Sequence, residues 1–291
     1  MNGDRALRQN YEQVLKRIRD ACEAAGRPAD SVRLLAVSKA FPAANVLALA
    51  ALGQRAFGEN YLQEALDKIA ACSDERSAAA AGRSATIEPA RESSDAAPRR
   101  AAPGSPLEWH FIGPIQSNKT RPIAEHFDWV HSVDREKIAR RLAEQRPAGL
   151  PPLNLCLQVN VSGEASKSGV APGEVVALAL ACAALSGVRL RGLMAIPEPT
   201  EDVALQRARF ATLRELHARV REALAANAAN DIFANAANGI FANAASDFDT
   251  LSMGMSADLE SAVMEGATIV RVGSALFGAR PPRQQTVSPS T

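Results

Sequence analysis

Short apolar runs recur along the chain and alternate with longer segments of helical periodicity. Residues 5–25 form an amphipathic segment in which apolar side chains return at helical spacing. Eight runs of strand length follow it, at residues 33–38, 55–58, 109–113, 128–133, 153–161, 189–196, 249–254 and 268–276. Most of these runs precede a segment with a helical pattern, for example REKIARRLAEQ and GEVVALALACAAL. Eight strand–helix repeats predict an α/β fold, a single (β/α)8 TIM barrel with an extra N-terminal helix.

An open, doubly wound parallel sheet is the alternative arrangement for the same alternation of strands and helices. Such sheets usually carry a glycine-rich turn after the first strand, where a dinucleotide binds. The segment around the end of the first run, AVSKAFPA, contains no glycine. The sequence therefore favours the closed barrel.

Two segments of biased composition interrupt this alternation. Residues 73–106 are rich in Ala, Ser, Arg and Pro and contain almost no large apolar residues, so they cannot build a core. Residues 226–248 hold most of a tandem octapeptide, ANAANDIF, ANAANGIF and ANAASDFD. We expect both to be low-complexity surface inserts, disordered or looped out of one barrel domain at 1–282. We expect 283–291 to be a flexible tail.

Charge, composition and cysteine usage narrow the function classes. Lys and Arg number 33 against 32 Asp and Glu, a formal net charge of +1, so no overall field attracts nucleic acid or an anionic membrane. None of the four cysteines lies in a CxxC pair or at zinc-site spacing from a histidine, so we expect no metal. The chain has no apolar run of about 18 residues and no secretory signal at its N-terminus, so we expect a cytoplasmic protein with free thiols.

Lysine 39 is the first residue with a chemical interpretation, because active sites of barrels lie at the carboxyl ends of the strands. Leu35, Val37 and Lys39 share one face by the period of two. If Leu35 and Val37 point into the barrel, Lys39 lies at its apolar mouth, where the charged ammonium form is disfavoured. A neutral amine is what Schiff-base chemistry with an aldehyde needs. The alternative is an ordinary loop lysine that swings out to solvent.

The last two runs carry the residue types of a phosphate site. SMGMSAD supplies Ser252 and Gly254, with Ser256 as the expected N-cap of the next helix, and RVGSALFG supplies Gly273 and Ser274. Barrels often bind phosphate with the loops after these two strands, through backbone N–H groups. Plain turn glycines are the alternative for either motif alone, and the two together favour a phosphate site.

Arg271 and His110 each allow two interpretations. Arg271 lies two residues before Gly273 and hence on its face, either as a buried ion-pair partner or as a group facing a ligand ring. His110 stands in WHFIGPIQSNK, where a core histidine satisfied by its neighbours is the alternative to a ligand contact. We expect the remaining histidines at surface or helix positions; they are His126, His131 and His217.

A Schiff-base lysine after the first strand and a phosphate site after the last two suggest pyridoxal 5′-phosphate. At this point the chain resembles the pyridoxal phosphate homeostasis protein family, also called the YggS/PROSC or alanine racemase N-terminal-like family. The resemblance runs from about residue 5 to 280, outside the two inserts. Its motifs are LLAVSKAFP, FGENYLQEALDKI, WHFIGPIQSNKTR, VNVSGEASKSGV, RGLMAIP, LSMGMSADLESAV and TIVRVGSALFGAR.

The resemblance implies a protein of intracellular pyridoxal phosphate homeostasis that holds the cofactor as a lysine aldimine on Lys39 without catalytic turnover. It implies that Arg271 faces the pyridine nitrogen, and a guanidinium keeps its proton, so the ring is left a weak electron sink. The other residues that the resemblance assigns to the cofactor are Asn60 and His110 on the ring side, Met194 packed near it, and Ser252, Gly254, Gly273 and Ser274 around the phosphate. We expect a monomer, with pyridoxal-phosphate-dependent apoenzymes as partners and no nucleic acid or membrane partner.

Two departures and three rival functions remain. Many family members read VSKTKP after the first strand, whereas Ala40 and Phe41 stand here, which removes a hydroxyl and a second lysine. An amino-acid racemase is the main rival, but related racemases take their opposing base, a tyrosine, from a further β-rich domain; the only tyrosines here are Tyr11 and Tyr61. A Schiff-base aldolase usually carries its lysine late in the barrel, and the sixth run has none. An interaction scaffold would work through the two inserts.

Overall fold

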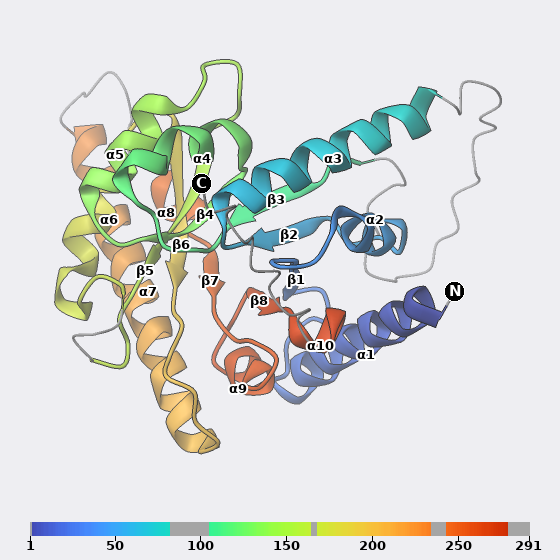
Figure 1. Ribbon diagram of the computed structural model, residues 1–291. Coiled ribbons are helices and arrows are strands. Elements are labelled where there is room, and N and C mark those ends of the chain that lie inside the picture. The colour runs from blue at the N-terminus through green and yellow to red at the C-terminus, as the bar shows by residue number, and fades with distance from the viewer. Residues whose placement is uncertain (1, 82–104, 164–167, 234–242, 279–291) are drawn as a thin grey trace, which may run out of the picture.

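Eight parallel strands close into a barrel in the computed structural model, which describes residues 2–81, 105–163, 168–233 and 243–278 (Figure 1). Each strand pairs with its neighbours in sequence, and β1 closes the ring against β8, with Ala36 opposite Val272. The strands are β1 Arg33–Val37, β2 Ala56–Glu59, β3 Glu108–Phe111, β4 Trp129–Val133, β5 Leu153–Gln158, β6 Val188–Met194, β7 Thr250–Ser252 and β8 Ile269–Val272. This confirms the (β/α)8 barrel and excludes the open sheet.

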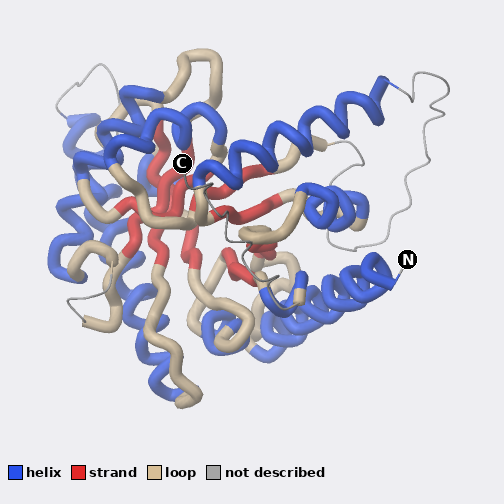
Figure 2. Tube along the Cα trace, viewed as in Figure 1, coloured by secondary structure: helices blue, strands red, loops and turns tan. Residues whose placement is uncertain are grey.

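Helices surround the barrel, and Figure 2 shows the strands gathered in the centre with helices on the outside. The extra helix α1 lies against α9 and α10, where Arg17 and Glu260 form an ion pair at 2.8 Å. The helices are α1 Asn2–Ala24, α2 Ala43–Ala51, α3 Leu62–Ala81, α4 Thr120–His126, α5 Glu136–Gln145, α6 Val175–Ala183, α7 Val203–Phe233, α8 Ala244–Asp247, α9 Leu259–Met264 and α10 Ser274–Phe277, with short 3-10 turns at Ser117–Lys119 and Pro172–Glu174.

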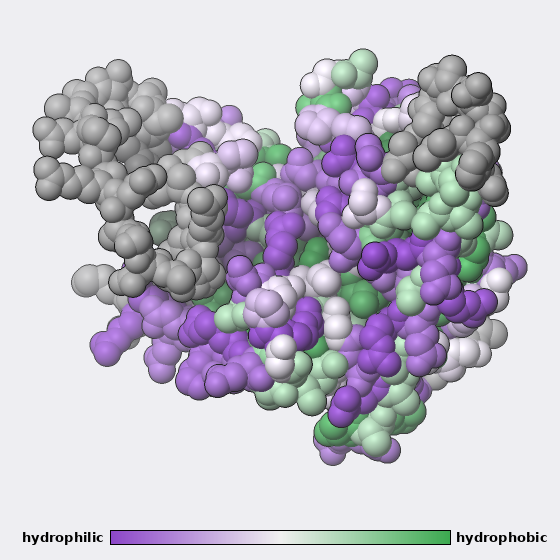
Figure 3. Space-filling view, turned by 180° about the vertical axis from the view of Figure 1, so that it is seen from behind, coloured by the Kyte–Doolittle hydropathy of each residue, from purple (hydrophilic) through white to green (hydrophobic). Residues whose placement is uncertain are grey.

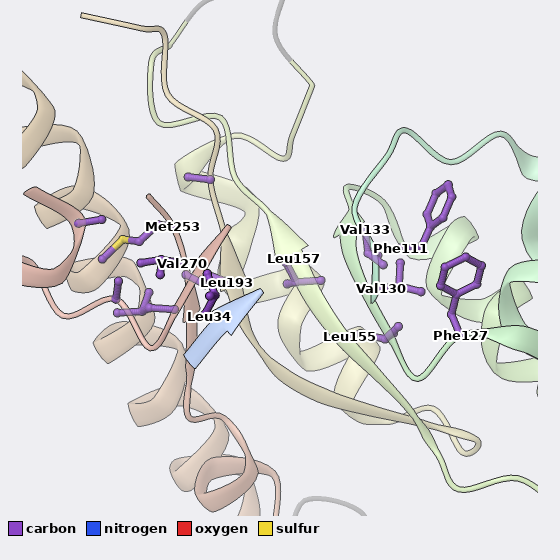
Figure 4. Packing of buried hydrophobic residues seen from close by; sticks show 14 of the residues in the cluster. Leu34, Phe111, Phe127, Val130, Val133, Leu155, Leu157, Leu193, Met253 and Val270 are labelled. Carbon is purple, nitrogen blue, oxygen red and sulfur yellow. The ribbon is translucent and has the colours of Figure 1, made fainter. Parts of the chain in front are cut away.

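The main hydrophobic core lies between the outer faces of the strands and the helices (Figure 4). Alternate residues of β5, Leu155 and Leu157, point outward into it and are fully buried. Phe111 of β3 meets Phe127 edge to face, with ring centroids 5.3 Å apart. Each large apolar side chain buried in this way contributes about 1.5–3 kcal/mol. The long apolar runs of the sequence thus serve the outside of the barrel as well as its inside.

Apolar and polar side chains both line the inside of the barrel. Leu35, Val37 and Ile269, from adjacent strands β1 and β8, form an inner apolar cluster with Ala56 and Ile112. Buried polar side chains from β3, β4, β7 and β8 also lie in the described interior; they are His110, His131, Ser252 and Arg271. Burying a polar group costs free energy unless the group is hydrogen-bonded, so each of these side chains needs a partner inside the barrel.

The molecular surface seen from behind is largely hydrophilic, with apolar residues scattered among polar ones (Figure 3). In the parts of the chain that the structure describes, none of the helices has the length and apolar character needed to span a membrane.

The two expected inserts differ from the prediction where the structure describes them. Residues 73–81 continue α3, 226–233 end α7, and α8 lies within the second segment. Alanine is the strongest helix former, which explains why these Ala-rich stretches are helical rather than looped out. Phe248 at the end of the second segment is buried and stacks on His217 with centroids 4.6 Å apart. Residues 82–104 and 234–242, and the expected tail at 283–291, lie outside the described residues.

The last apolar run, 268–276, is not one strand. Strand β8 ends at Val272, and α10 begins at Ser274 after Gly273 as its N-cap. A Cβ atom on Gly273 would lie 3.3 Å from the carbonyl oxygen of Val37, so the chain passes close to the end of β1 at this point. The sequence pattern could not locate this boundary because the helix continues the apolar run.

Candidate functional site

Lysine 39 lies at the carboxyl end of β1, directly after the inward-facing Leu35 and Val37. It is partly buried, and it follows the fully buried Ser38 in a turn. Ala40, the next residue, has a φ of 65°, a left-handed conformation that is uncommon outside glycine. The backbone N–H of Ala40 donates to the Glu64 carboxylate at 2.6 Å. This bond holds the unusual turn formed by Lys39 and Ala40.

A buried ion pair fixes the same turn from the other side. Lys68 of α3 donates to Glu59 at 2.6 Å and to the carbonyl oxygen of Ser38 at 2.8 Å. The Ser38 hydroxyl donates to the same Glu59 oxygen at 2.6 Å. Both charged side chains are buried, Lys68 at 5% and Glu59 at 0% exposure. Burial raises the pKa of Glu59, and the ammonium of Lys68 opposes that rise. The sequence interpretation missed this pair, which joins β1, β2 and α3.

Phenylalanine 41 explains one departure from the family pattern. Its ring stacks on Phe277 of α10, with centroids 4.8 Å apart and an interplanar angle of 23°. Phe41 is therefore packed between the β1 loop and the helix after β8, not directed at the mouth. The stack ties the loop that carries Lys39 to the loop that carries Gly273 and Ser274.

Asparagine 60 follows β2 and carries an unsatisfied acceptor. Its Oδ1 atom is buried and has no hydrogen-bond partner among the residues that the structure describes. The chain after β3 passes so close that a Cβ on Gly113 would lie 2.1 Å from the Asn60 carbonyl oxygen, so only glycine fits there. Buried polar atoms nearly always have a partner, and an orphan in a strand-end loop points to a ligand.

The loops after β7 and β8 lie against each other. Gly254 has a φ of 90°, and its carbonyl oxygen accepts the backbone N–H of Arg271 at 2.9 Å. The hydroxyl oxygens of Ser256 and Ser274 lie 3.4 Å apart across the two loops. Ser256 was expected to be a helix N-cap, and this is wrong: α9 begins at Leu259 after Asp258, whose carboxylate instead accepts the N–H of Met255. Ser256 is therefore left in the loop facing Ser274.

Arginine 271 is buried inside the barrel at 3% exposure. Its guanidinium donates to the backbone oxygen and the hydroxyl of Ser252, at 2.6 and 2.9 Å, and to the backbone oxygen of Ala195 at 2.9 Å. All three acceptors are uncharged. Burial lowers the pKa of Arg271 to about 10, so it stays protonated at neutral pH. The first alternative, a buried ion-pair partner, receives no support from these contacts.

The remaining predicted site residues are buried in the interior of the barrel. His110 is fully buried, with one ring nitrogen 2.6 Å from Glu108 and the other 2.8 Å from His131, which matches the alternative of a satisfied core histidine. The Ser252 hydroxyl is buried between His131 and Arg271 rather than open toward the phosphate loops. Met194 is fully buried in a cluster with Trp129 and Cys156, and its register partner on β7 is Ser252.

Histidine 131 was expected at a surface or helix position, and this is wrong. It lies on β4 at 0% exposure and joins the interior polar residues. The signal was present in the sequence, since His131 shares an inward face with Trp129 by the strand period of two. By contrast, His126 is exposed at the end of α4, and His217 lies half-buried on α7.

We predict that stability falls as the pH falls below about 6.5, because buried neutral histidines must be charged on unfolding. Burial lowers the pKa of His131 well below 6.5, lowers that of His110 despite Glu108, and lowers that of His217 to about 4. Below 6.5 the unfolded chain binds protons that the folded chain does not. Each histidine then removes up to about 1.4 kcal/mol of stability per pH unit.

Urea unfolding curves measured between about pH 7 and about pH 5 test this dependence. The control is His126→Gln, which removes an exposed histidine and should leave the slope unchanged. A free energy of unfolding that stays constant across this window would contradict the assignment.

The four cysteines and the carboxylates offer little reactive chemistry. All four thiols are free and buried, and burial raises the pKa of Cys72 to about 11 and of Cys156 and Cys182 to about 12. Such thiols are inert as nucleophiles. Within the described ranges, no group of three or more His, Cys, Asp or Glu side chains is arranged to hold a metal ion.

Taken together, the geometry defines a closed (β/α)8 barrel with a candidate site at the carboxyl ends of its strands. The chain belongs to the family described as "Alanine racemase, N-terminal domain", whose sequence model matches residues 5–281.

Curated relatives match almost the whole chain. A protein of Pseudomonas aeruginosa is 54% identical over 274 residues, which cover 94% of this chain and 96% of that one. A protein of Escherichia coli K12 is 42% identical over 274 residues, covering 94% and 97%. Both relatives are named "Pyridoxal phosphate homeostasis protein". The resemblance based on the seven motifs is therefore confirmed.

Solved structures show the same fold. PipY of Synechococcus elongatus PCC7942, with pyridoxal phosphate bound, is similar at a TM-score of 0.63 and 34% identity, covering 89% of this chain and 98% of PipY. Alanine racemase from Corynebacterium glutamicum is similar at a TM-score of 0.55 and 15% identity, covering 96% of this chain and 65% of the racemase. The second likeness shows the fold alone, and the racemase rival is a distant relative in fold.

Proposed function

We propose that this chain binds pyridoxal 5′-phosphate covalently through Lys39 and serves intracellular homeostasis of the cofactor without catalytic turnover. The observation that carries the proposal is the close approach of the end of β1, which precedes Lys39, to the loop after β8. Gly273 passes beside Val37 at the end of β1, and Phe41 and Phe277 stack across the same junction. An amine and a phosphate site thus share one corner of the barrel mouth. The names of the relatives and the PipY complex support the same cofactor.

The residues present fit this cofactor. Asn60 brings a buried acceptor without a partner in the described structure, and Arg271 brings a buried guanidinium whose contacts are uncharged oxygens. Ser256 and Ser274 bring two adjacent hydroxyls to the phosphate end. The Ser252 hydroxyl is engaged elsewhere, so Ser256 replaces it in our assignment, beside the backbone of Gly254 and Gly273.

When bound, pyridoxal phosphate supplies an aldehyde that condenses with a primary amine, forming a C=N bond and releasing water. Lys39 supplies the amine, and the clamped turn at Ser38 and Ala40 directs it. Arg271 stays protonated and would donate to the ring nitrogen of the bound cofactor, which would leave that nitrogen without a proton. An unprotonated ring withdraws electrons weakly, so the site holds the cofactor better than it drives carbanion chemistry.

The racemase alternative depends on a second base opposite Lys39. Tyr11 is buried on α1, where its hydroxyl lies 3.5 Å from the side-chain oxygen of Gln54. Tyr61 follows Asn60 at the mouth and is 46% exposed, so it is the one tyrosine placed to test this alternative. We propose that it does not serve as a base, because the weak electron sink at Arg271 disfavours the carbanion that racemisation needs.

The test is to load the protein with pyridoxal phosphate, remove free cofactor by gel filtration and measure the cofactor retained by absorbance. We expect one cofactor per chain and, on incubation with L-alanine, no more D-alanine than free cofactor produces. Retention of no cofactor would refute binding. Rapid racemisation that Tyr61→Phe abolishes would establish the enzyme instead.

We further propose that the protein works in the cytoplasm as a monomer and passes the cofactor to apoenzymes. Four free thiols suit a reducing compartment. Gel filtration with light scattering tests the monomer. Transfer to an apoenzyme is tested by mixing loaded protein with a pyridoxal-phosphate-dependent apoenzyme and following the recovery of its activity.

A further inference from the structure

A chain of hydrogen bonds crosses the interior of the barrel from the amino ends of the strands to the carboxyl ends. It starts at Glu108 on β3, whose carboxylate oxygen accepts from Arg33 at 2.7 Å and lies 2.6 Å from His110. His131 on β4 lies 2.8 Å from His110 and 2.8 Å from the hydroxyl of Ser252 on β7. The chain thus connects one rim of the barrel with a residue that touches Arg271 near the other rim.

The charge of Glu108 fixes the direction in which the hydrogens point. Burial acts to raise the pKa of Glu108, but the hydrogen bond from His110 and the charge of Arg33 lower it, so the carboxylate is ionised and accepts from His110 Nε2. Burial lowers the pKa of both histidines, so each ring carries one hydrogen. His110 therefore accepts at Nδ1 from His131, and His131 accepts at Nδ1 from the Ser252 hydroxyl.

Packing holds the middle of the chain in place. The Trp129 ring lies parallel to His110, at 5.4 Å between centroids and 8°, and the Arg191 guanidinium lies 4.9 Å from the centroid of the Trp129 ring. Other charged groups near the amino ends of the strands have their own partners. Asp128 accepts the N–H of Trp109 at 2.8 Å, and Arg191 donates to Asp249 at 2.6 Å. The histidine rings therefore have one arrangement, set by Glu108.

We propose that Glu108, His110 and His131 are positioning residues that hold Arg271, through Ser252, as the donor facing the ring nitrogen of bound pyridoxal phosphate. The inference rests on the proposed function. Because the only hydroxyl hydrogen of Ser252 points to His131, its lone pairs face Arg271. Both Ser252 oxygens then accept from the same guanidinium nitrogen. The guanidinium is fixed with its charge directed to the cofactor.

The decisive variant is Glu108→Gln, measured in the full chain loaded with pyridoxal phosphate. The amide has the size of the carboxylate and can still accept from His110. It removes the negative charge that sets the direction of the hydrogen bonds. Glu108 lies at the rim opposite Lys39, so the variant cannot act by touching the cofactor. We expect the absorbance maximum of the bound cofactor to shift and its dissociation constant to rise about three- to tenfold.

Two further variants separate positioning from folding. His131→Leu interrupts the chain of hydrogen bonds and should raise the dissociation constant of the cofactor about tenfold or more. His131→Gln has an amide that both donates and accepts, so its dissociation constant should lie closer to that of the wild type. The control is His126→Leu, an exposed histidine on α4, which should leave spectrum and affinity unchanged. Urea unfolding establishes that each variant is folded.

Folded Glu108→Gln and His131→Leu proteins with the wild-type spectrum and affinity would overturn the inference. If His131→Leu does not fold, Glu108→Gln alone decides. Wild-type protein that retains no cofactor refutes the proposed function instead, so the two failures are distinguishable.

Discussion

Replacing Lys39 by alanine is expected to remove covalent binding of pyridoxal phosphate completely. The substitution deletes the amine and leaves in place the proposed phosphate contacts of Ser256 and Ser274 and the proposed donor Arg271. The variant should therefore bind the cofactor more weakly and without the absorbance band of the lysine-linked form. Absorbance after gel filtration and equilibrium dialysis measure the two effects.

The matched control is Lys137→Ala, which removes an exposed lysine from α5 outside the site. It should bind pyridoxal phosphate with the wild-type spectrum and affinity. A Lys39→Ala protein that keeps both properties would show that another group holds the cofactor.

Replacing Lys68 by methionine is expected to cause the largest loss of stability, about 3–5 kcal/mol in the free energy of unfolding. The loss arises because Glu59 would stay buried without its cation, and its second oxygen already lacks a partner among the described residues. The turn before Lys39 would also lose the bond from Lys68 to Ser38. Urea unfolding of the variant measures the effect.

Two comparisons make this expectation specific. Lys16→Met breaks an exposed ion pair with Asp20 on α1 and should cost less than about 1 kcal/mol. Adding Glu59→Gln to Lys68→Met removes the stranded charge and should recover a large part of the loss. Equal small losses for Lys68→Met and Lys16→Met would contradict the role of the buried pair.

The barrel could be predicted from the sequence because eight apolar runs alternate with helical segments, and a parallel barrel imposes that alternation. The boundaries were less accessible where one apolar run serves two elements. At Gly273 the strand becomes a helix within continuous apolar sequence, and only the approach to Val37 marks the change. Likewise, Ala-rich composition at 73–81 suggested an insert, although high helix propensity extends α3 through it.

The parts of the candidate site that depend on strand order could be predicted from the sequence. The parts that depend on contacts across the barrel could not. Lys39 and the residues after β7 and β8 could be predicted as candidate site residues, because active sites of barrels lie at the carboxyl ends of the strands. His131 was misplaced, and its bond with Ser252 was not predicted, because the two residues are 121 positions apart in the sequence. The alternation of a strand gives the face of each residue but not its partner on the opposite wall.

Reduction with borohydride followed by peptide mass mapping tests the account most directly. Borohydride converts the C=N bond between a lysine and pyridoxal phosphate into a stable C–N bond, which marks the lysine that held the cofactor. We predict the added mass on the peptide that contains Lys39 and none on Lys68, which is engaged with Glu59 and Ser38. Added mass on another lysine, or on none, would contradict the central claim that Lys39 at the barrel mouth holds the cofactor.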